Sequence, residues 1–158
     1  MNVLVVSDTH KKNENYFRAL KKVKPNLVIH CGDIEGSENI LLEKTGCKLE
    51  MVAGNNDYFS ELPTEREFVI GKYRLWVTHG HNYYVSMGTE RLKQEARVRG
   101  VHIVLCGHTH RPKIDLSDDV MVVNPGSISY PRQDGRKPSY VLMDFDRFGE
   151  VHFTIRYL

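Results

Sequence analysis

The chain has 158 residues, of which 41% are hydrophobic and 27% are charged, and its formal net charge is +2. This length suits one domain, so we expect residues 1–158 to fold around a single core. A charge this small, without a basic run, argues against nucleic-acid binding by charge alone, and no stretch approaches the ~20 apolar residues that span a bilayer. The three cysteines cannot all pair and the N-terminus does not resemble a signal segment, so we expect a reduced, cytoplasmic protein.

The first third of the chain alternates short apolar runs with segments of helical spacing. The runs lie at 3–6, 27–29 and 49–53, and the helical segments follow Asn13 and Ser37, residue types that favour helix N-caps. Pro25 and Gly46 close these two segments. Strand and helix units in series predict a parallel sheet with right-handed crossovers.

The pattern then changes to a hairpin. Residues 68–70 and 73–77 flank Gly71-Lys72, which fits a type II′ turn with glycine at its first central position. A helix is expected over about 89–99 and a buried strand over 101–105. The remaining apolar runs, at 120–123, 140–145 and 151–155, predict antiparallel strands, and the polar segment 129–137 predicts an exposed loop.

Polar side chains that can bind metal follow five of these strands. They are Asp8, His10, Asp33, Asn55, His79, His108 and His110. In an extended segment residues two apart point to the same side, so His108 and His110 could aim at one point, as could Asp8 and His10. Because ligands in open α/β sheets gather at the carboxyl ends of strands, we expect all seven side chains to meet in one crevice.

Seven ligands are too many for one tetrahedral ion, but they suit two ions about 3.5–4 Å apart that share a carboxylate and activate a water as the nucleophile. Imidazole ligands disfavour calcium and magnesium and point to transition metals, with manganese the first choice and iron, zinc or nickel as alternatives. With only Asp8 and Asp33 anionic, two divalent ions leave the site positive and attractive to phosphate. The sequence therefore predicts metal-assisted hydrolysis of a phosphate ester.

The ordered motifs resemble those of the calcineurin-like metallophosphoesterase superfamily, over nearly the whole chain. The motifs are Asp8-x-His10, Gly32-Asp33, Gly54-Asn55-x-Asp57, His79-Gly80 and Gly107-His108-x-His110. The short length and the segment Asn124-Pro125-Gly126-Ser127 look most like its small prokaryotic phosphodiesterase branch.

This resemblance implies an α/β fold, a four-layer αββα sandwich of two mixed sheets flanked by helices, with a dinuclear site at one edge. It also implies two overlapping ligand sets. Asp8, His10, Asp33 and His110 would hold one ion, and Asp33, Asn55, His79 and His108 would hold the other. His81, two residues after His79, is an alternative ligand or a group that supports one.

The chain departs from the family at Asn56. Many members carry a histidine there that donates a proton to the leaving oxygen or contacts the phosphoryl group, whereas an amide only donates hydrogen bonds. Asn56 and His108 are therefore the catalytic candidates, Asn55 and Asn56 the substrate-binding candidates, and Asp57 is expected to serve the loop instead of a histidine. Weak activity on esters with poor leaving groups follows.

The predicted function is that of a metal-dependent phosphodiesterase acting on a small diester. No membrane partner is expected, and the sequence is compatible with a homo-oligomer. Two alternatives stay open: a non-catalytic scaffold, like a eukaryotic retromer subunit of similar fold, and a phosphomonoesterase or nucleotidase. Tyr58, Tyr83 and Tyr84 could stack on a nucleobase. Arg111 and Arg132 are interpreted as solvated charges, with contact to a distal phosphate as the alternative.

Overall fold

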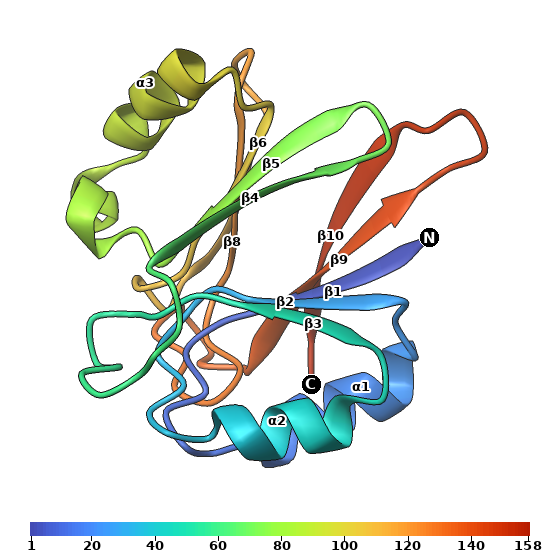
Figure 1. Cartoon of the computed structure of the whole chain (residues 1–158), viewed down its shortest axis with the longest axis vertical. Helices are drawn as coiled ribbons and strands as arrows, with labels where there is room; N and C mark the ends of the chain where they lie inside the picture. Colours follow the sequence, from blue (N-terminus) through green and yellow to red (C-terminus); the bar gives the residue numbers. More distant parts are fainter.

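The computed structural model describes all residues from 1 to 158 and contains two five-stranded mixed sheets packed face to face (Figure 1). The first sheet has the strand order β10-β9-β1-β2-β3. Its strands are β1 (Asn2–Val6), β2 (Leu27–His30), β3 (Lys48–Met51), β9 (Ser139–Phe145) and β10 (Val151–Tyr157). The three N-terminal strands run parallel, as the sequence predicts, and β9 and β10 add antiparallel partners at one side.

The second sheet has the strand order β4-β5-β6-β8-β7. Its strands are β4 (Glu65–Ile70), β5 (Tyr73–Thr78), β6 (Ile103–Leu105), β7 (Pro112–Asp115) and β8 (Met121–Pro125). The predicted hairpin is confirmed, because Ile70 pairs with Tyr73 across a turn in which Gly71 has a φ of 58°. The sequence did not predict β7, a half-exposed edge strand that pairs antiparallel with β8.

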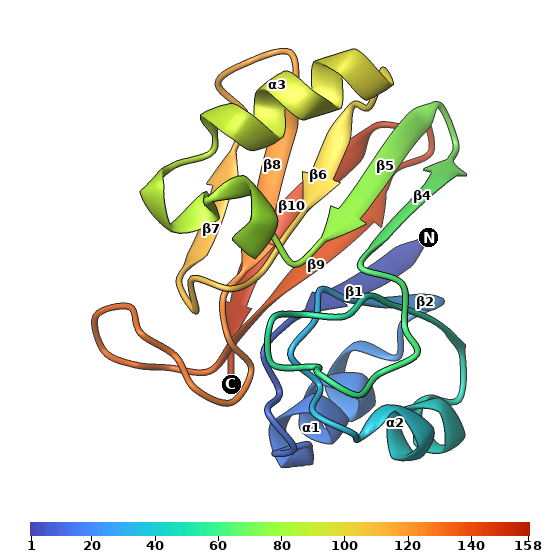
Figure 2. The ribbon, with the colours of Figure 1, turned by 60° about the vertical axis from the view of Figure 1, so that its left-hand side comes forward.

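Helices cover the outer faces of both sheets. α1 (Glu14–Val23) and α2 (Glu38–Thr45) pack on the first sheet, and α3 (Glu90–Arg99) packs on the second (Figures 1 and 2). The predicted αββα layering is confirmed. Neither Asn13 nor Ser37 makes a side-chain capping hydrogen bond, although both occupy the predicted N-cap positions. None of the three helices has the length and apolar content needed to cross a membrane.

The interior consists of three apolar layers and not the single core that the chain length suggested. Alternating residues of the central strands explain this arrangement: Val3 and Val5 of β1 face the second sheet, while Leu4 and Val6 face α1 and α2. Trp76 lies in the third layer, beneath α3. Because both faces of the central strands are buried, polar side chains from these strands can gather only beyond their ends.

Those ends share one edge of the molecule. β1, β2 and β3 run parallel in the first sheet, and β5, β6 and β8 run parallel in the second. Figure 2 shows the loops that follow β1, β2 and β3 meeting the ends of β5 and β6 where the two sheets come together. Two 3-10 turns, η1 (His81–Tyr83) and η2 (Val85–Met87), fill the connection from β5 to α3 beside this edge.

Candidate metal centre

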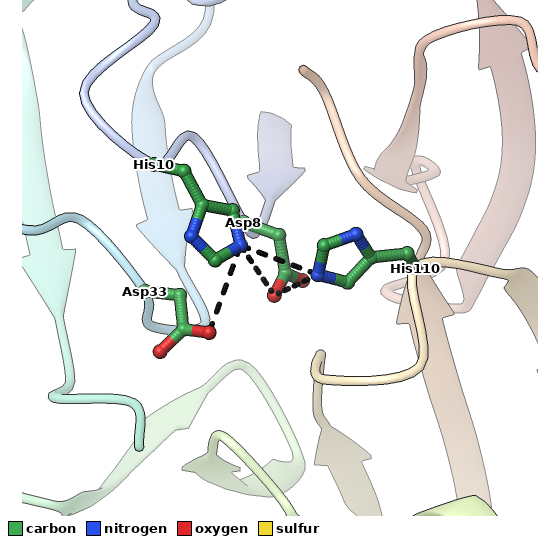
Figure 3. Close-up of side chains that lie close together, drawn as sticks. All are labelled: Asp8, His10, Asp33 and His110. Atoms are coloured by element: carbon green, nitrogen blue, oxygen red, sulfur yellow. Dashed lines mark hydrogen bonds and ion pairs between the residues drawn. The ribbon is translucent and has the colours of Figure 1, made fainter. Parts of the chain in front are cut away.

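Four of the seven predicted ligands form a compact group, shown in Figure 3. Asp8, His10, Asp33 and His110 each offer a ligand atom, and these atoms lie within 4.8 Å of one another. They come from the loops after β1, β2 and β6. Three of the four side chains are buried, and only that of His10 is partly exposed. Acidic and imidazole groups gathered in a buried pocket are typical of a transition-metal site.

The ligands converge because their backbone turns sharply, which corrects the extended geometry expected from the sequence. The φ angles of Asp8, His10, Asp33, His108 and His110 are 58°, 44°, 59°, 70° and 56°. This left-handed conformation costs a residue with a side chain roughly 1–2 kcal/mol. Loop hydrogen bonds offset the cost: the backbone N–H of Asp8 donates to the Gly32 carbonyl and that of His10 to the Asp33 carbonyl, both at 3.0 Å. Such strain is typical of functional sites.

Three imidazoles have their outer nitrogen, Nδ1, held by an oxygen. The partners are Glu35 Oε1 for His10 at 2.5 Å, the Cys31 carbonyl for His79 at 2.7 Å, and the Tyr130 carbonyl for His110 at 2.6 Å. A carbonyl or a carboxylate only accepts, so Nδ1 carries the proton in each ring. The inner nitrogens, Nε2, then point into the pocket, where those of His10 and His110 lie 3.2 Å from each other. Fixing Nδ1 in this way is the arrangement that orients histidine ligands toward a metal.

The inner nitrogens surround one carboxylate oxygen. Asp8 Oδ1 lies 3.1 Å from His110 Nε2, 3.7 Å from His10 Nε2 and 3.9 Å from His79 Nε2. Yet neither Asp8 Oδ1 nor His79 Nε2 makes a hydrogen bond of acceptable geometry, although both atoms are buried. Leaving buried polar atoms unpaired is costly. A divalent cation among these atoms would satisfy both of them, so the residues present fit a metal ion.

The electrostatics of the pocket favour added positive charge. Burial opposes ionisation of Asp33, but His79 and the amides of Asn56 outweigh it and hold the pKa of Asp33 at about 2. The pKa of Asp8 is lowered even further, since His10 and His110 outweigh its complete burial. Burial also opposes protonation of His10, but Asp8 and Glu35 raise its pKa to about 9. The carboxylates therefore attract a cation, whether a proton or a metal ion.

The second predicted ligand set is assembled more loosely. Its shared member, Asp33, has Oδ2 3.3 Å from His79 Nε2 and 3.7 Å from His10 Nε2, so this carboxylate touches both sets. His108 and Asn55 pair with each other, with 2.9 Å between His108 Nδ1 and Asn55 Oδ1. The rings of His79 and His108 lie 5.2 Å apart. The structure thus brings all seven predicted ligands into one region.

The two residues after Asn55 act on the loops. Asn56 donates to both oxygens of Asp33, from its backbone N–H at 2.9 Å and from Nδ2 at 2.8 Å. Asp57 accepts four backbone N–H groups, from Asp33, Ile34, Glu35 and Gly54. This agrees with the loop role expected for Asp57, and it places the Asn56 side chain on the carboxylate that touches both ligand sets.

Two motif glycines allow the backbone to approach the carboxylates closely. A Cβ added at Gly54 would collide with Asp33, both with its carboxylate and with its backbone nitrogen. A Cβ added at Gly107 would collide with Ser7 and would come within 3.0 Å of Asp8 Oδ2. Glycine is therefore required before Asn55 and before His108 by close packing.

Comparison with known families identifies the chain once this geometry is known. The model of the calcineurin-like phosphoesterase superfamily domain matches residues 1–147. The chain belongs to this superfamily. A probable metallophosphoesterase of Methanocaldococcus jannaschii is 34% identical over 140 residues, which cover 84% of this chain and 70% of the relative. A phosphodiesterase of the same organism is 28% identical over 145 residues, covering 80% of this chain and 83% of that protein.

The fold also recurs outside the named phosphoesterases. The crystal structure of Vps29 from Entamoeba histolytica complexed with zinc has a TM-score of 0.77 and 23% identity, and the match covers 99% of each chain. At this identity the similarity concerns the fold alone. The superfamily domain thus carries a set of histidines and carboxylates that could bind metal, in a fold shared with Vps29.

Two features of this superfamily member could not be read from the motifs. Glu35 holds the His10 ring, but in the sequence it is distinguished only as an acidic residue two positions after Asp33. The Tyr130 carbonyl holds His110, and a backbone acceptor leaves no signal in the side-chain sequence.

The remaining histidines near the site have distinguishable surroundings. His81 Nδ1 is buried without a partner, its ring lies 5.5 Å from that of His79, and burial lowers its pKa, so this neutral ring adjoins the site outside the compact group. His30 pairs with Thr9 Oγ1 at 3.1 Å and accepts the Gly32 N–H at 3.2 Å. Burial lowers the pKa of His30 to about 4, so it is a neutral packing residue.

Proposed function

We propose that this phosphoesterase is a phosphodiesterase that uses two divalent transition-metal ions, with manganese as the first choice. The observation that supports it best is the buried Asp8 Oδ1, which three imidazole Nε2 atoms surround without a hydrogen bond. When bound, the two ions would supply an activated water and neutralise charge on the phosphoryl oxygens.

The residues divide into the two sets expected from the superfamily. Asp8, His10, Asp33 and His110 would hold one ion, and Asp33, Asn55, His79 and His108 would hold the other. Asp33 would be the shared ligand because its Oδ2 lies near both His10 and His79. Glu35 and the carbonyls of Cys31 and Tyr130 keep the imidazole protons on the outer nitrogens.

The preference for diesters rests on Asn56. Its side-chain amide donates a hydrogen bond to Asp33, as does its backbone N–H, and the amide has no proton to give to a leaving oxygen near neutral pH. An ester whose leaving group is stable as an anion needs no such proton. Activated diesters are therefore better substrates than alkyl monoesters, and we expect Asn55 and Asn56 to donate to the phosphoryl oxygens.

Hydrolysis of bis(p-nitrophenyl) phosphate and of an alkyl monoester, glycerol 2-phosphate, with metal titration, tests this proposal. We expect about two ions per chain, turnover of the diester that chelation abolishes and manganese restores, and a lower rate with the monoester. Activity that persists after confirmed metal removal, or equal rates on both esters, would contradict the proposal.

The second candidate is a protein-interaction scaffold, and Asn56 is the observation that favours it, since the histidine common in the superfamily is missing here. The intact set of seven ligands argues against it. No hydrolysis with manganese, iron, zinc or nickel, together with an unchanged biological role for a ligand-free variant, would decide for the scaffold.

The cysteines support a location in the cytoplasm as part of the proposal. Cys31, Cys47 and Cys106 are all unpaired, and burial raises the pKa of Cys106 to about 12, so this thiol is unreactive. A protein with three free thiols suits a reducing compartment.

A further inference from the structure

Two cavities flank the compact ligand group, and Glu35 lines both of them. The cavity of about 740 Å³ is bordered by the loop with Tyr58 and Phe59, and we call it the aromatic cavity. The cavity of about 680 Å³ is lined by His10, His110 and three arginines, Arg111, Arg132 and Arg136, and we call it the arginine cavity. A phosphodiester has two ester arms, so a diester bound at the metal centre can extend in both directions.

The charges of the two cavities are opposite. Besides Glu35, the aromatic cavity is lined by the acidic residues Glu38, Asp57 and Glu61 and by one cation, Lys11. In the arginine cavity Glu35 is the only acid, and it is already engaged by His10. An anionic group on the substrate would therefore be repelled from one side of the metal centre and attracted to the other.

The arginines of this cavity are free to bind an anion. None of Arg111, Arg132 and Arg136 lies within 4.0 Å of a carboxylate. Of the other arginines, Arg66, Arg74, Arg97 and Arg99 are paired with acids, and the four unpaired ones, Arg18, Arg91, Arg147 and Arg156, do not line this cavity. A guanidinium presents donors in a planar fork that matches two phosphate oxygens. Binding a phosphoryl group here would break no ion pair.

The arginine cavity is attached to the metal centre through His110. The backbone N–H of Arg132 donates to the His110 carbonyl at 3.0 Å, while His110 Nδ1 donates to the Tyr130 carbonyl at 2.6 Å. The Tyr130 ring packs edge-on against His10, with 5.4 Å between the ring centres, and Lys12 Nζ lies 4.5 Å from the centre of the Tyr130 ring. These contacts fix the position of the 129–137 loop relative to His10 and His110.

We propose that the arginine cavity binds a second phosphoryl group, carried on one ester arm of the substrate. The proposal rests on the proposed phosphodiesterase function and specifies its substrate class: a small diester with a further phosphate on one side and an apolar or aromatic group on the other. Under this proposal Arg111 and Arg132 contact a distal phosphate of the substrate, which was the alternative to their interpretation as solvated charges.

A matched pair of substrates tests it. Thymidine 5′-(p-nitrophenyl phosphate) and its 3′-phosphorylated form differ only in the second phosphate. Since one hydrogen bond to a charged group is worth about a factor of ten in affinity, we expect the phosphorylated diester to have a kcat/KM at least about tenfold higher, mainly through KM. In the double variant Arg111→Gln/Arg132→Gln this ratio should fall toward one.

The control removes two arginines elsewhere. Arg147 and Arg156 are exposed residues of the β9–β10 hairpin without acidic partners, and Arg147→Gln/Arg156→Gln changes the net charge equally. This control should keep the wild-type ratio. A wild-type ratio near one, or a preference that survives in the Arg111→Gln/Arg132→Gln variant, would overturn the proposal.

A binding measurement separates this proposal from the proposed function. If neither diester is hydrolysed, the phosphodiesterase assignment fails, and calorimetric titration with thymidine 3′,5′-bisphosphate and thymidine 5′-monophosphate decides on the cavity by itself. At least tenfold tighter binding of the bisphosphate, lost in the Arg111→Gln/Arg132→Gln variant and kept in the control, supports the cavity. Equal affinities for both nucleotides overturn it.

Discussion

The group Asp8, His10, Asp33 and His110 and the group Asn55, His79 and His108 occupy one crevice, but their side chains are held differently. In the first group both imidazoles have Nδ1 fixed by an outside oxygen, so their inner nitrogens already face the carboxylates and lie 3.2 Å from each other. In the second group the Cys31 carbonyl fixes His79 Nδ1, but His108 Nδ1 is 2.9 Å from Asn55 Oδ1, so this ring is held only by another predicted ligand. Binding an ion through His108 Nδ1 would break that contact, whereas the rings of the first group would keep their outside partners.

This difference shows that predicted ligands of the same chemical type can be oriented to different degrees before an ion binds. Rings whose orientation is fixed beforehand lose little freedom when an ion binds, whereas a pair that must separate pays for its own hydrogen bond. We therefore expect two binding steps of unequal affinity, the tighter one at the first group. The following variants test this comparison.

The largest effect is expected for Asp33→Asn, because Asp33 touches both groups. If each of the two proposed ions lowers the barrier by several kcal/mol, losing both should reduce kcat/KM for the diester by about 10³-fold or more. Elemental analysis should find less than one ion per chain at a metal concentration that saturates the wild type. Two ions retained in a folded variant would show that Asp33 is not shared.

The next largest effects, expected for His110→Ala and His108→Ala, distinguish the two ligand groups. His110→Ala should weaken the tighter step and His108→Ala the weaker step, each by at least about 100-fold, since each removes a direct ligand. Calorimetric manganese titrations of both variants measure the two steps. If both substitutions weakened the same step equally, the division into two groups would be wrong.

Glu35→Gln tests how much the fixed orientation of the His10 ring contributes to metal binding, without removing a predicted ligand. Because Glu35 fixes the His10 ring at 2.5 Å, its loss should weaken the tighter step by about 10–100-fold and leave the weaker step nearly unchanged. The matched control is Glu61→Gln, an exposed acid of the aromatic cavity, which removes the same charge away from His10. Equal effects of both substitutions would mean that only net charge matters.

The smallest effect is expected for Asn56→His. A histidine beside Asp57 could supply the proton that Asn56 lacks, but it would give up the amide hydrogen bond to Asp33. General acid catalysis typically contributes 10²–10⁴-fold, and we expect only about a tenfold rise in the ratio of monoester to diester turnover because Asp57 is occupied by four backbone N–H groups. No change in that ratio would show that position 56 does not control leaving-group chemistry.

Much of the fold could be predicted because its strands are buried on both faces. Such strands read as continuous apolar runs, as in Val3–Val6 of β1, and the glycine of the β4–β5 turn reports a positive φ directly. β7 was not predicted because an edge strand needs no apolar run, and Pro112–Asp115 contains a single aliphatic residue.

The candidate site could be predicted only as a set of residues. Asp8, His10 and His110 stand out because polar groups directly after buried strands are unusual, and the parallel order of β1, β2 and β3 brings such groups to one edge. The expected extended geometry was wrong, because φ values near 50° at these positions depend on hydrogen bonds from loops distant in the sequence.

The sequence by itself determined that the first three strands run parallel, the superfamily and the seven candidate ligands, since each of these depends on residue type and on spacing along the chain. Tertiary structure decided which groups hold the ligands. Glu35 reaches His10 from the loop after the neighbouring strand β2, and the Tyr130 carbonyl reaches His110 from the connection between β8 and β9. It also decided that Arg111 and Arg132 line one cavity, because the hydrogen bond from Arg132 to the His110 carbonyl folds the 129–137 loop back onto the end of β6. Contacts of this kind join residues that are remote in the chain, and no local pattern encodes them.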